Sequence, residues 1–257
     1  MTALAVSPAA APPRPSLARL TGVELRKMTD TRAGRWLLAL VALTGVVSVP
    51  IVIATSPGRD QGLQDMFSIA QLGPQLLLPV VGILAVTAEW SQRTALTTFA
   101  LVPVRWRVAV AKLLAGAVLG LASLPVTLAT AVAGRGAGGL VGRSEGSWHL
   151  PSFVVGTAAL LAVTGVLTGM AFGMLLMNTP LAITLNFVLP VALTTLTQTV
   201  HRLRGPLGWV DLSRATEPLS DVGVTSGEWA RVATALAVWL AVPLAAGVVR
   251  LNRREIN

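Results

Sequence analysis

Cysteine is absent from the 257 residues of this chain, which excludes a disulfide framework and a thiolate metal site. Charged residues are scarce, at 12% of the chain against 53% hydrophobic residues. The chain also lacks a G-x-x-x-x-G-K-S/T phosphate-binding loop, so it cannot bind ATP through that motif. If the chain moves a solute uphill, we expect the energy to come from another polypeptide.

Charge is missing altogether from six long apolar stretches. They comprise residues 36–54, 66–88, 113–134, 150–177, 181–200 and 232–249. Each is long enough for a helix that crosses a bilayer, which needs roughly 17–25 residues. Because every backbone amide must be satisfied inside the protein in hydrocarbon, such stretches cross as helices. The sequence therefore predicts an all-α membrane protein with six transmembrane helices, the fourth and fifth separated by the helix-breaking sequence Asn178-Thr179-Pro180.

The basic residues divide unequally between the two sides of these predicted spans. With the N-terminus inside, thirteen of the 20 Lys and Arg residues fall on the inner side and seven on the outer side. The positive-inside rule then places both termini in the cytoplasm. The net charge of +9 lies on that inner face, so membrane topology explains the basic pI and no nucleic-acid partner is expected. Residues 1–15 are predicted to be a disordered cytoplasmic tail, followed by a single transmembrane domain, residues 16–257.

The six stretches also lack the groups on which several classes of membrane protein depend. Proton-coupled transporters usually carry intramembrane carboxylates or histidines. Here the two histidines, His149 and His201, lie at the edges of the spans. An intramembrane protease or metalloenzyme needs a nucleophile with a base, or a cluster of ligands, and the stretches contain neither. We therefore assign no catalytic residue, metal or cofactor to this chain.

Residues 16–31 precede the first span and show helical amphipathicity. Apolar residues gather on one side, Arg19 and Arg26 lie opposite, and Ser16 is a candidate N-cap. The pattern predicts a helix that lies along the inner leaflet. Glu24 and Lys27 fall within its apolar side. Either the two form an ion pair, or Glu24 contacts a partner or another span.

Residues 89–112 form a second basic segment on the inner side, whose charge alone would fit an ordinary loop. Its order of residues is Glu89, Thr94, Thr97, Thr98, Pro103, Arg105 and Lys112. This order resembles the segment between the second and third spans of ABC type-2 exporter permeases, which reads E-x-x-x-G-T, then P-x-R and a lysine. The glycine of that pattern is Arg93 here. The resemblance extends to the E-L-R-K of residues 24–27, the six spans, a long outer loop and a short basic C-terminal tail.

The resemblance implies the ABC type-2 permease architecture, with residues 16–31 as connecting helix and 89–112 as coupling loop. It implies an exporter in a bacterial cytoplasmic membrane, paired with a second copy or a paralogous permease, and driven by ATPase subunits that hold ATP and Mg. The residues it implies as ATPase-coupling residues are Glu24, Arg26, Lys27, Glu89, Arg93, Thr94, Thr97 and Arg105. We expect Glu89 to cap the N-terminus of a coupling helix, where a carboxylate is favoured.

Two sets of residues inside the spans indicate helix contacts or a transport route. Glycines four apart allow close approach of helices, within one subunit or at a dimer or sliding seam; they are Gly116, Gly120, Gly165, Gly169 and Gly173. Polar residues either bond across helices or form a weakly polar wall of the route; the candidates are Gln71, Gln75, Asn186, Thr194 and Gln198. A route without charge suits an amphipathic small molecule, drug, peptide or lipid.

The outer loop, residues 201–231, is either solvated or dips back into the membrane as a re-entrant segment. Three functions stay open on the sequence. The first is the permease subunit of an ATP-driven exporter. The second is a membrane anchor or immunity-type protein that binds a partner without transport. The third is a secondary transporter or channel, against which the missing intramembrane carboxylates argue.

Overall fold

The computed structural model describes residues 15–55, 61–91 and 105–253, and within these ranges every regular element is a helix. Six of the helical segments are long and apolar enough to cross a membrane. They are Arg32–Thr55, Leu63–Glu89, Trp106–Leu140, Ser152–Leu176, Thr179–Thr199 and Ser226–Arg250. The prediction of an all-helical protein with six membrane-length spans is confirmed. The predicted tail lies outside the described residues, except for Pro15.

Helix α1 (Leu17–Asp30) precedes the first span, and the elements after it build the six spans. In chain order these elements are α2 (Arg32–Thr55), α3 (Leu63–Ala70), α4 (Leu72–Ser91), α6 (Arg105–Leu140), α7 (Ser152–Leu176), α8 (Thr179–Thr199), α11 (Ser226–Leu236), η3 (Ala237–Ala241) and α12 (Val242–Arg253). Asn178 caps α8 by accepting a hydrogen bond from the backbone N–H of Leu181 at 3.0 Å, so the predicted break is a helix start.

The third span is longer than the sequence predicts. Helix α6 contains 36 residues and is roughly 54 Å long, whereas the apolar stretch covers only 113–134. Its charged ends, with Lys112 at one side and Arg135 at the other, are therefore helical and buried rather than parts of loops. Of the predicted coupling loop 89–112, Glu89–Ser91 ends α4 and Arg105–Lys112 begins α6; residues 92–104 lie outside the described part.

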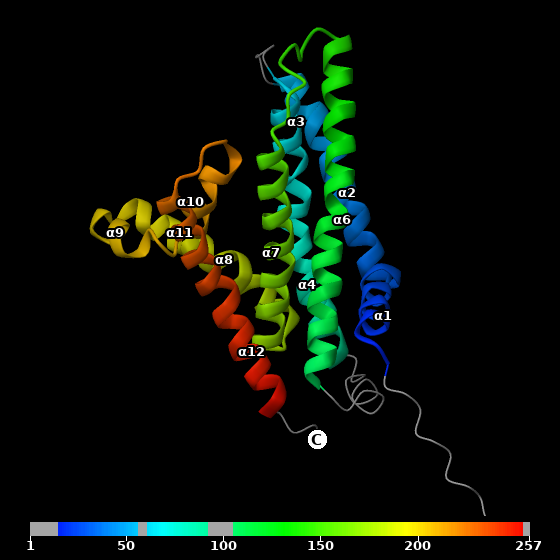
Figure 1. The fold of residues 1–257 in the computed structure, drawn as a ribbon, viewed down its shortest axis with the longest axis vertical. Helices are drawn as coiled ribbons and strands as arrows, with labels where there is room; N and C mark the ends of the chain where they lie inside the picture. The colour runs from blue at the N-terminus through cyan, green and yellow to red at the C-terminus, as the bar shows by residue number, and fades with distance from the viewer. Residues whose placement is uncertain (1–14, 56–60, 92–104, 254–257) are drawn as a thin grey trace, which may run out of the picture.

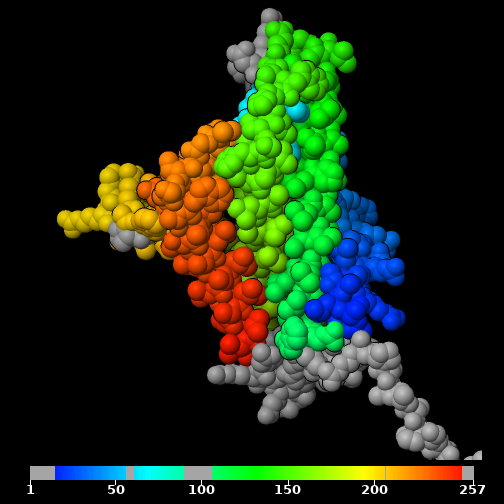
Figure 2. Space-filling model, viewed as in Figure 1, coloured from blue at the N-terminus to red at the C-terminus, as the bar shows by residue number. Residues whose placement is uncertain are grey.

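Helices α2, α3, α4, α6 and α7 form an upright bundle, and α8, α11 and α12 lean away from it on the α7 side (Figure 1). Helix α1 lies at the lower end beside α6, on the surface of the molecule (Figure 2). The described end of α12 lies at that same end (Figure 1). The first and last described helices thus meet one end of the bundle, as an even number of crossings requires.

Glycines on α7 and α6 permit close contacts of α7 with α4 and with α6. A Cβ atom at Gly169 would lie 2.0 Å from the carbonyl oxygen of Pro79 on α4, and one at Gly173 would lie 3.2 Å from that of Ile83. On α6, a Cβ atom at Gly120 would lie 3.0 Å from the Cα of Val163 on α7, and Gly116 meets Met170. These glycines therefore pack helices within one chain. Gly165 differs, because its added Cβ would meet only Pro79 at 3.7 Å.

The segment after α8 folds into short helices. They are η1 (His201–Leu203), α9 (Arg204–Leu207), α10 (Leu212–Thr216) and η2 (Glu217–Ser220). Of these, η1, α9 and α10 contact α8, and η2 contacts α7. Helix α9 lies on the side away from α7 (Figure 1). Asp211, fully buried, accepts hydrogen bonds from the hydroxyls of Thr194 and Thr197 on α8 at 2.8 and 2.7 Å. The hydroxyl of Thr157 on α7 donates to Leu219 at 2.7 Å. The predicted outer loop is thus fastened to two spans rather than free in solvent.

Candidate functional site

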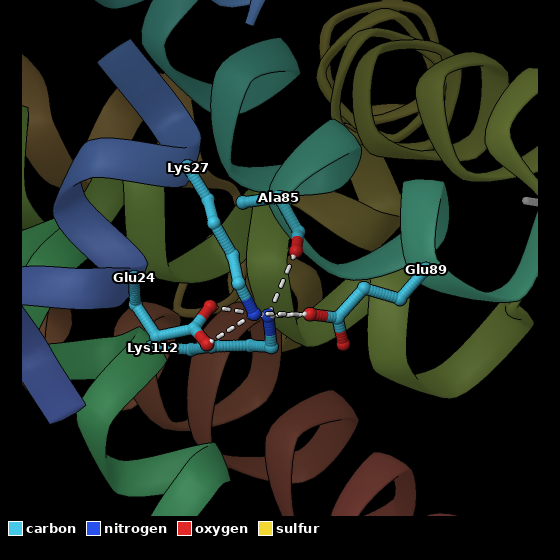
Figure 3. Close-up of polar contacts among 5 residues, drawn as sticks. All are labelled: Glu24, Lys27, Ala85, Glu89 and Lys112. Atoms are coloured by element: carbon cyan, nitrogen blue, oxygen red, sulfur yellow. Dashed lines mark hydrogen bonds and ion pairs between the residues drawn. The ribbon is translucent and has the colours of Figure 1, made fainter. Parts of the chain in front are cut away.

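Four charged side chains from three helices meet at the lower end of the bundle, and we call them the charge cluster. Glu24 and Lys27 come from α1, Glu89 from the last turn of α4, and Lys112 from the second turn of α6 (Figure 3). Glu24 and Lys27 lie three residues apart and so share one face of α1. Helix α6 brings Lys112 to that face because it begins well before its apolar stretch.

Lys112 makes three contacts that match the three donors of an ammonium group. Its Nζ lies 2.5 Å from Glu24 Oε2, 2.9 Å from Glu89 Oε1 and 3.3 Å from the carbonyl oxygen of Ala85 (Figure 3). Lys27 Nζ donates to Glu24 Oε1 at 2.8 Å and to Glu89 Oε1 at 2.9 Å. Each lysine therefore bridges both carboxylates, and each carboxylate receives both lysines.

The cluster is largely shielded from solvent and has no net charge. The side chains of Lys112 and Glu24 are 7% and 6% exposed, Glu89 is 14% exposed, and Lys27 is 42% exposed. Burial of the Lys27 ammonium acts to lower its pKa. The hydrogen bonds to Glu24 and Glu89 outweigh that effect, so the pKa of Lys27 is raised above its ordinary value. Lys27 is thus held as a cation at neutral pH.

Further contacts fasten both ends of α1. Near its start, Arg107 of α6 donates a hydrogen bond to the carbonyl oxygen of Pro15 at 2.7 Å. Near its end, Met28 is buried in the apolar core with Val41 and Leu78. The following turn is tight, because a Cβ atom at Gly34 would lie 1.9 Å from the carbonyl oxygen of Met28. Helix α1 is therefore a firmly docked part of the bundle.

The structure brings together three of the predicted ATPase-coupling residues, Glu24, Lys27 and Glu89. Both alternatives for Glu24 hold together, since it pairs with Lys27 and also contacts another span through Lys112. Arg26 is exposed on α1, and Arg105 is the first residue of α6. Arg93, Thr94 and Thr97 lie outside the described residues, as does the helix that Glu89 was expected to cap. Glu89 itself lies within α4, and its carboxylate accepts from the two lysines.

A second site is a cavity of about 490 Å³ between α4, α7, α8 and the short outer helices. Two predicted pathway-lining residues, Gln75 and Asn186, belong to its wall. Gln71 is buried at the junction of α3 and α4, and Thr194 bonds to Asp211; neither lines the cavity. Gln198 is exposed and also lies outside the wall. The predicted polar set therefore divides between one cavity and other contacts.

Sequence reasoning missed several residues that matter at these two sites. Lys112 was not predicted as a site residue. It lies one position before the third apolar stretch, and a lysine directly beside a predicted span was the available signal. Asp211 has a buried carboxylate in the segment after α8. Glu217, from the same segment, and Trp239 lie in the cavity wall. Across the described ranges, no group of three or more His, Asp or Glu residues is placed to hold a metal ion.

The charge cluster ties a surface helix to the two spans that flank residues 92–104, and the cavity offers room for a small molecule between spans. Comparison of the chain with models of known protein families and with curated proteins finds no match.

Proposed function

We propose that this chain is the transmembrane subunit of an ATP-driven exporter of the ABC type-2 permease class. The resemblance of residues 16–31 and 89–112 to the connecting helix and coupling loop of that class supports the proposal. The strongest support is the charge cluster, because its ion pairs join these two segments. A cargo passes through spans contributed by this chain and a second permease, while a separate ATPase binds ATP and Mg at the cytoplasmic face.

The cluster gives a physical reason for coupling through these segments. Glu89 lies shortly before residues 92–104 and Lys112 shortly after them, and both contact the same face of α1. A push on α1 or on the intervening segment therefore moves the ends of α4 and α6 together. Removing one member of a buried ion cluster leaves its partner uncompensated, so the cluster favours one docked arrangement of the three helices.

The first test is purification of the tagged chain in mild detergent, with identification of copurifying proteins and an assay of ATP hydrolysis. We expect a soluble ATPase with a phosphate-binding loop, recovered in amounts comparable to the chain. Recovery of the chain without an ATPase would count against the exporter and favour a membrane anchor. Solute movement in proteoliposomes that needs no ATP would instead favour a secondary transporter or channel.

The second test separates coupling from assembly. We expect Glu89→Gln to keep the ATPase bound but to reduce the stimulation of its hydrolysis by cargo. Asp30→Asn is the matched control, because Asp30 is an exposed carboxylate on α1 that lines neither site. Equal stimulation in Glu89→Gln and wild-type complexes would remove the charge cluster from the coupling route.

A further inference from the structure

The cavity between α4, α7 and α8 has the size and composition of a binding site for a small molecule. Its volume of about 490 Å³ lies within the usual range for ligand pockets, roughly 300–1,000 Å³. Apolar side chains such as Leu76, Phe187 and Val191 make much of the wall. The polar groups come from the middle of α7 and α8 and from the outer segment, so the site can hold an amphipathic molecule.

Three donors of the wall are already used within the protein. Thr164 donates its hydroxyl proton to the carbonyl oxygen of Leu160 at 2.7 Å, and Thr216 donates to that of Leu212 at 2.8 Å. The single N–H of the Trp239 indole donates to the carbonyl oxygen of Val210 at 2.7 Å. What these residues leave to a ligand are oxygen lone pairs and the face of an indole ring. These three residues therefore offer a ligand acceptors and a ring face rather than donors.

Asn186 adds a polar group that has no partner. Its side chain is 8% exposed, it lines the cavity, and its Oδ1 is buried without a hydrogen bond. Buried polar atoms are normally hydrogen-bonded, so an exception in a cavity wall points to a ligand. Rotation of the amide about its terminal torsion presents either end to the cavity. With Oδ1 turned inward, Asn186 accepts a hydrogen bond from a bound N–H group.

Charge completes the description of the site. Glu217 is the one charged residue among those found in the wall, and it is exposed at the mouth on η2. Its carboxylate attracts a cation toward the cavity. A cation is also attracted to the face of an indole ring such as that of Trp239. An anion would meet repulsion from Glu217.

We propose that this cavity binds a lipophilic cation, namely a protonated amine attached to an apolar body. The ammonium group lies between Glu217, the Trp239 ring and the amide of Asn186, and the apolar body lies against Leu76, Phe187 and Val191. Binding is a property of this chain alone. That such amines are the transported cargo rests on the proposed exporter function and makes them its substrate class.

The test uses three probes with the same twelve-carbon chain and different head groups: dodecylammonium, dodecanol and dodecanoate. Binding of each labelled probe is measured by equilibrium dialysis against the full chain in lipid nanodiscs, with protein-free nanodiscs subtracted. We expect one saturable site for dodecylammonium, with affinity at least about tenfold above dodecanol, the ratio expected for one charge-assisted contact. Equal affinity for dodecanol, preference for dodecanoate, or no binding above protein-free nanodiscs would overturn the proposal.

Two pairs of matched variants locate the site. We expect Glu217→Gln to weaken dodecylammonium binding about tenfold and Asp221→Asn, an exposed carboxylate outside the wall, to leave it unchanged. We expect Gly165→Leu to fill the cavity and abolish binding. Gly156→Leu places the same side chain on α7 where the added Cβ meets nothing within 4 Å, so it keeps binding. Equal effects within either pair would contradict the assigned site.

The outcomes separate this site from the exporter itself. A copurifying ATPase together with no amine binding would leave the exporter standing and remove the cavity as its binding site. Amine binding by a chain that recovers no ATPase would keep the cavity and remove the exporter.

Discussion

Lys112 and Glu24 lie 88 positions apart in the sequence, yet Lys112 Nζ is 2.5 Å from Glu24 Oε2 and both side chains are almost completely buried. The contact joins the surface helix α1 to the first turns of α6. Because Lys112 also binds Glu89, removal of this one ammonium affects two carboxylates and three helices at once.

The first prediction concerns the stability of the charge cluster. We expect Lys112→Met to lower the free energy of unfolding by about 3–5 kcal/mol, because Glu24 and Glu89 stay buried with one cation fewer. Chemical unfolding in mild detergent, followed by circular dichroism, measures the change. Lys27→Met is the control and should cost clearly less, since Lys27 is 42% exposed. Adding Glu24→Gln to Lys112→Met should recover part of the loss, and strictly additive losses would contradict a shared cluster.

The second prediction concerns alkaline pH. The pKa of Lys27 is raised in the folded protein, so its stabilisation is complete below the unfolded value of about 10.4 and is lost as pH rises through the higher folded value. We expect the difference in thermal midpoint between wild type and Lys27→Met to be constant from pH 7 to about 10 and to shrink above it. A difference that already declines below pH 9 would contradict the raised pKa.

The third prediction concerns the contact between α4 and α7. We expect Gly169→Ala to destabilise the protein strongly, because the added Cβ would lie 2.0 Å from the backbone oxygen of Pro79 and the helices must move apart. Gly165→Ala, one turn away on the same helix, meets Pro79 at 3.7 Å and should be tolerated. Yield of monodisperse protein and its thermal midpoint in detergent compare the two. Equal behaviour would mean that α4 and α7 do not approach as closely as described.

The fourth prediction concerns the outer segment. We expect Asp211→Ala to release α10 from α8, because the hydroxyls of Thr194 and Thr197 and the backbone N–H of Arg214 lose their acceptor. The expected loss is about 1–3 kcal/mol of local stability. Faster proteolytic cleavage between residues 201 and 225 of the protein in lipid nanodiscs, where both faces are accessible, would report it. Asp221→Ala is the control and should cleave at the wild-type rate, since the Asp221 carboxylate is exposed on that segment.

The sequence predicts the spans well because their signal is local. A run of apolar residues identifies each membrane-length helix, and short-range rules identify caps such as Ser16, whose hydroxyl accepts from the N–H of Arg19 at 3.2 Å. The break at Asn178 follows from the same rules. Each of these features depends on residues within one or two helical turns.

The rest depends on contacts between distant segments. The burial of Lys112 could not be predicted from its position next to a span, because the two carboxylates that neutralise it come from α1 and α4. The sequence pattern indicates Thr194 as a pathway residue. In the structure its hydroxyl donates a hydrogen bond to Asp211, which comes from a segment without helical periodicity. The apolar pattern alone predicts ends of α6 that lie too far inward, because it stops at Lys112 and Arg135. Both residues are helical in the structure, since acceptors from other segments satisfy their charges.

Helix α6 is held by a buried cation near each end. Lys112 is fixed by the charge cluster, and Arg135 donates to the carbonyl oxygens of Ser144 and Gly146 beneath the ring of Trp148. The stretch between the two is roughly 35 Å of helix, a little more than the hydrocarbon thickness of a bilayer. Neither side chain is free to extend toward the headgroups, so in a thinner membrane this helix has to tilt. We expect the spacing of these two cations to match the hydrocarbon thickness in which α6 spans with the least tilt.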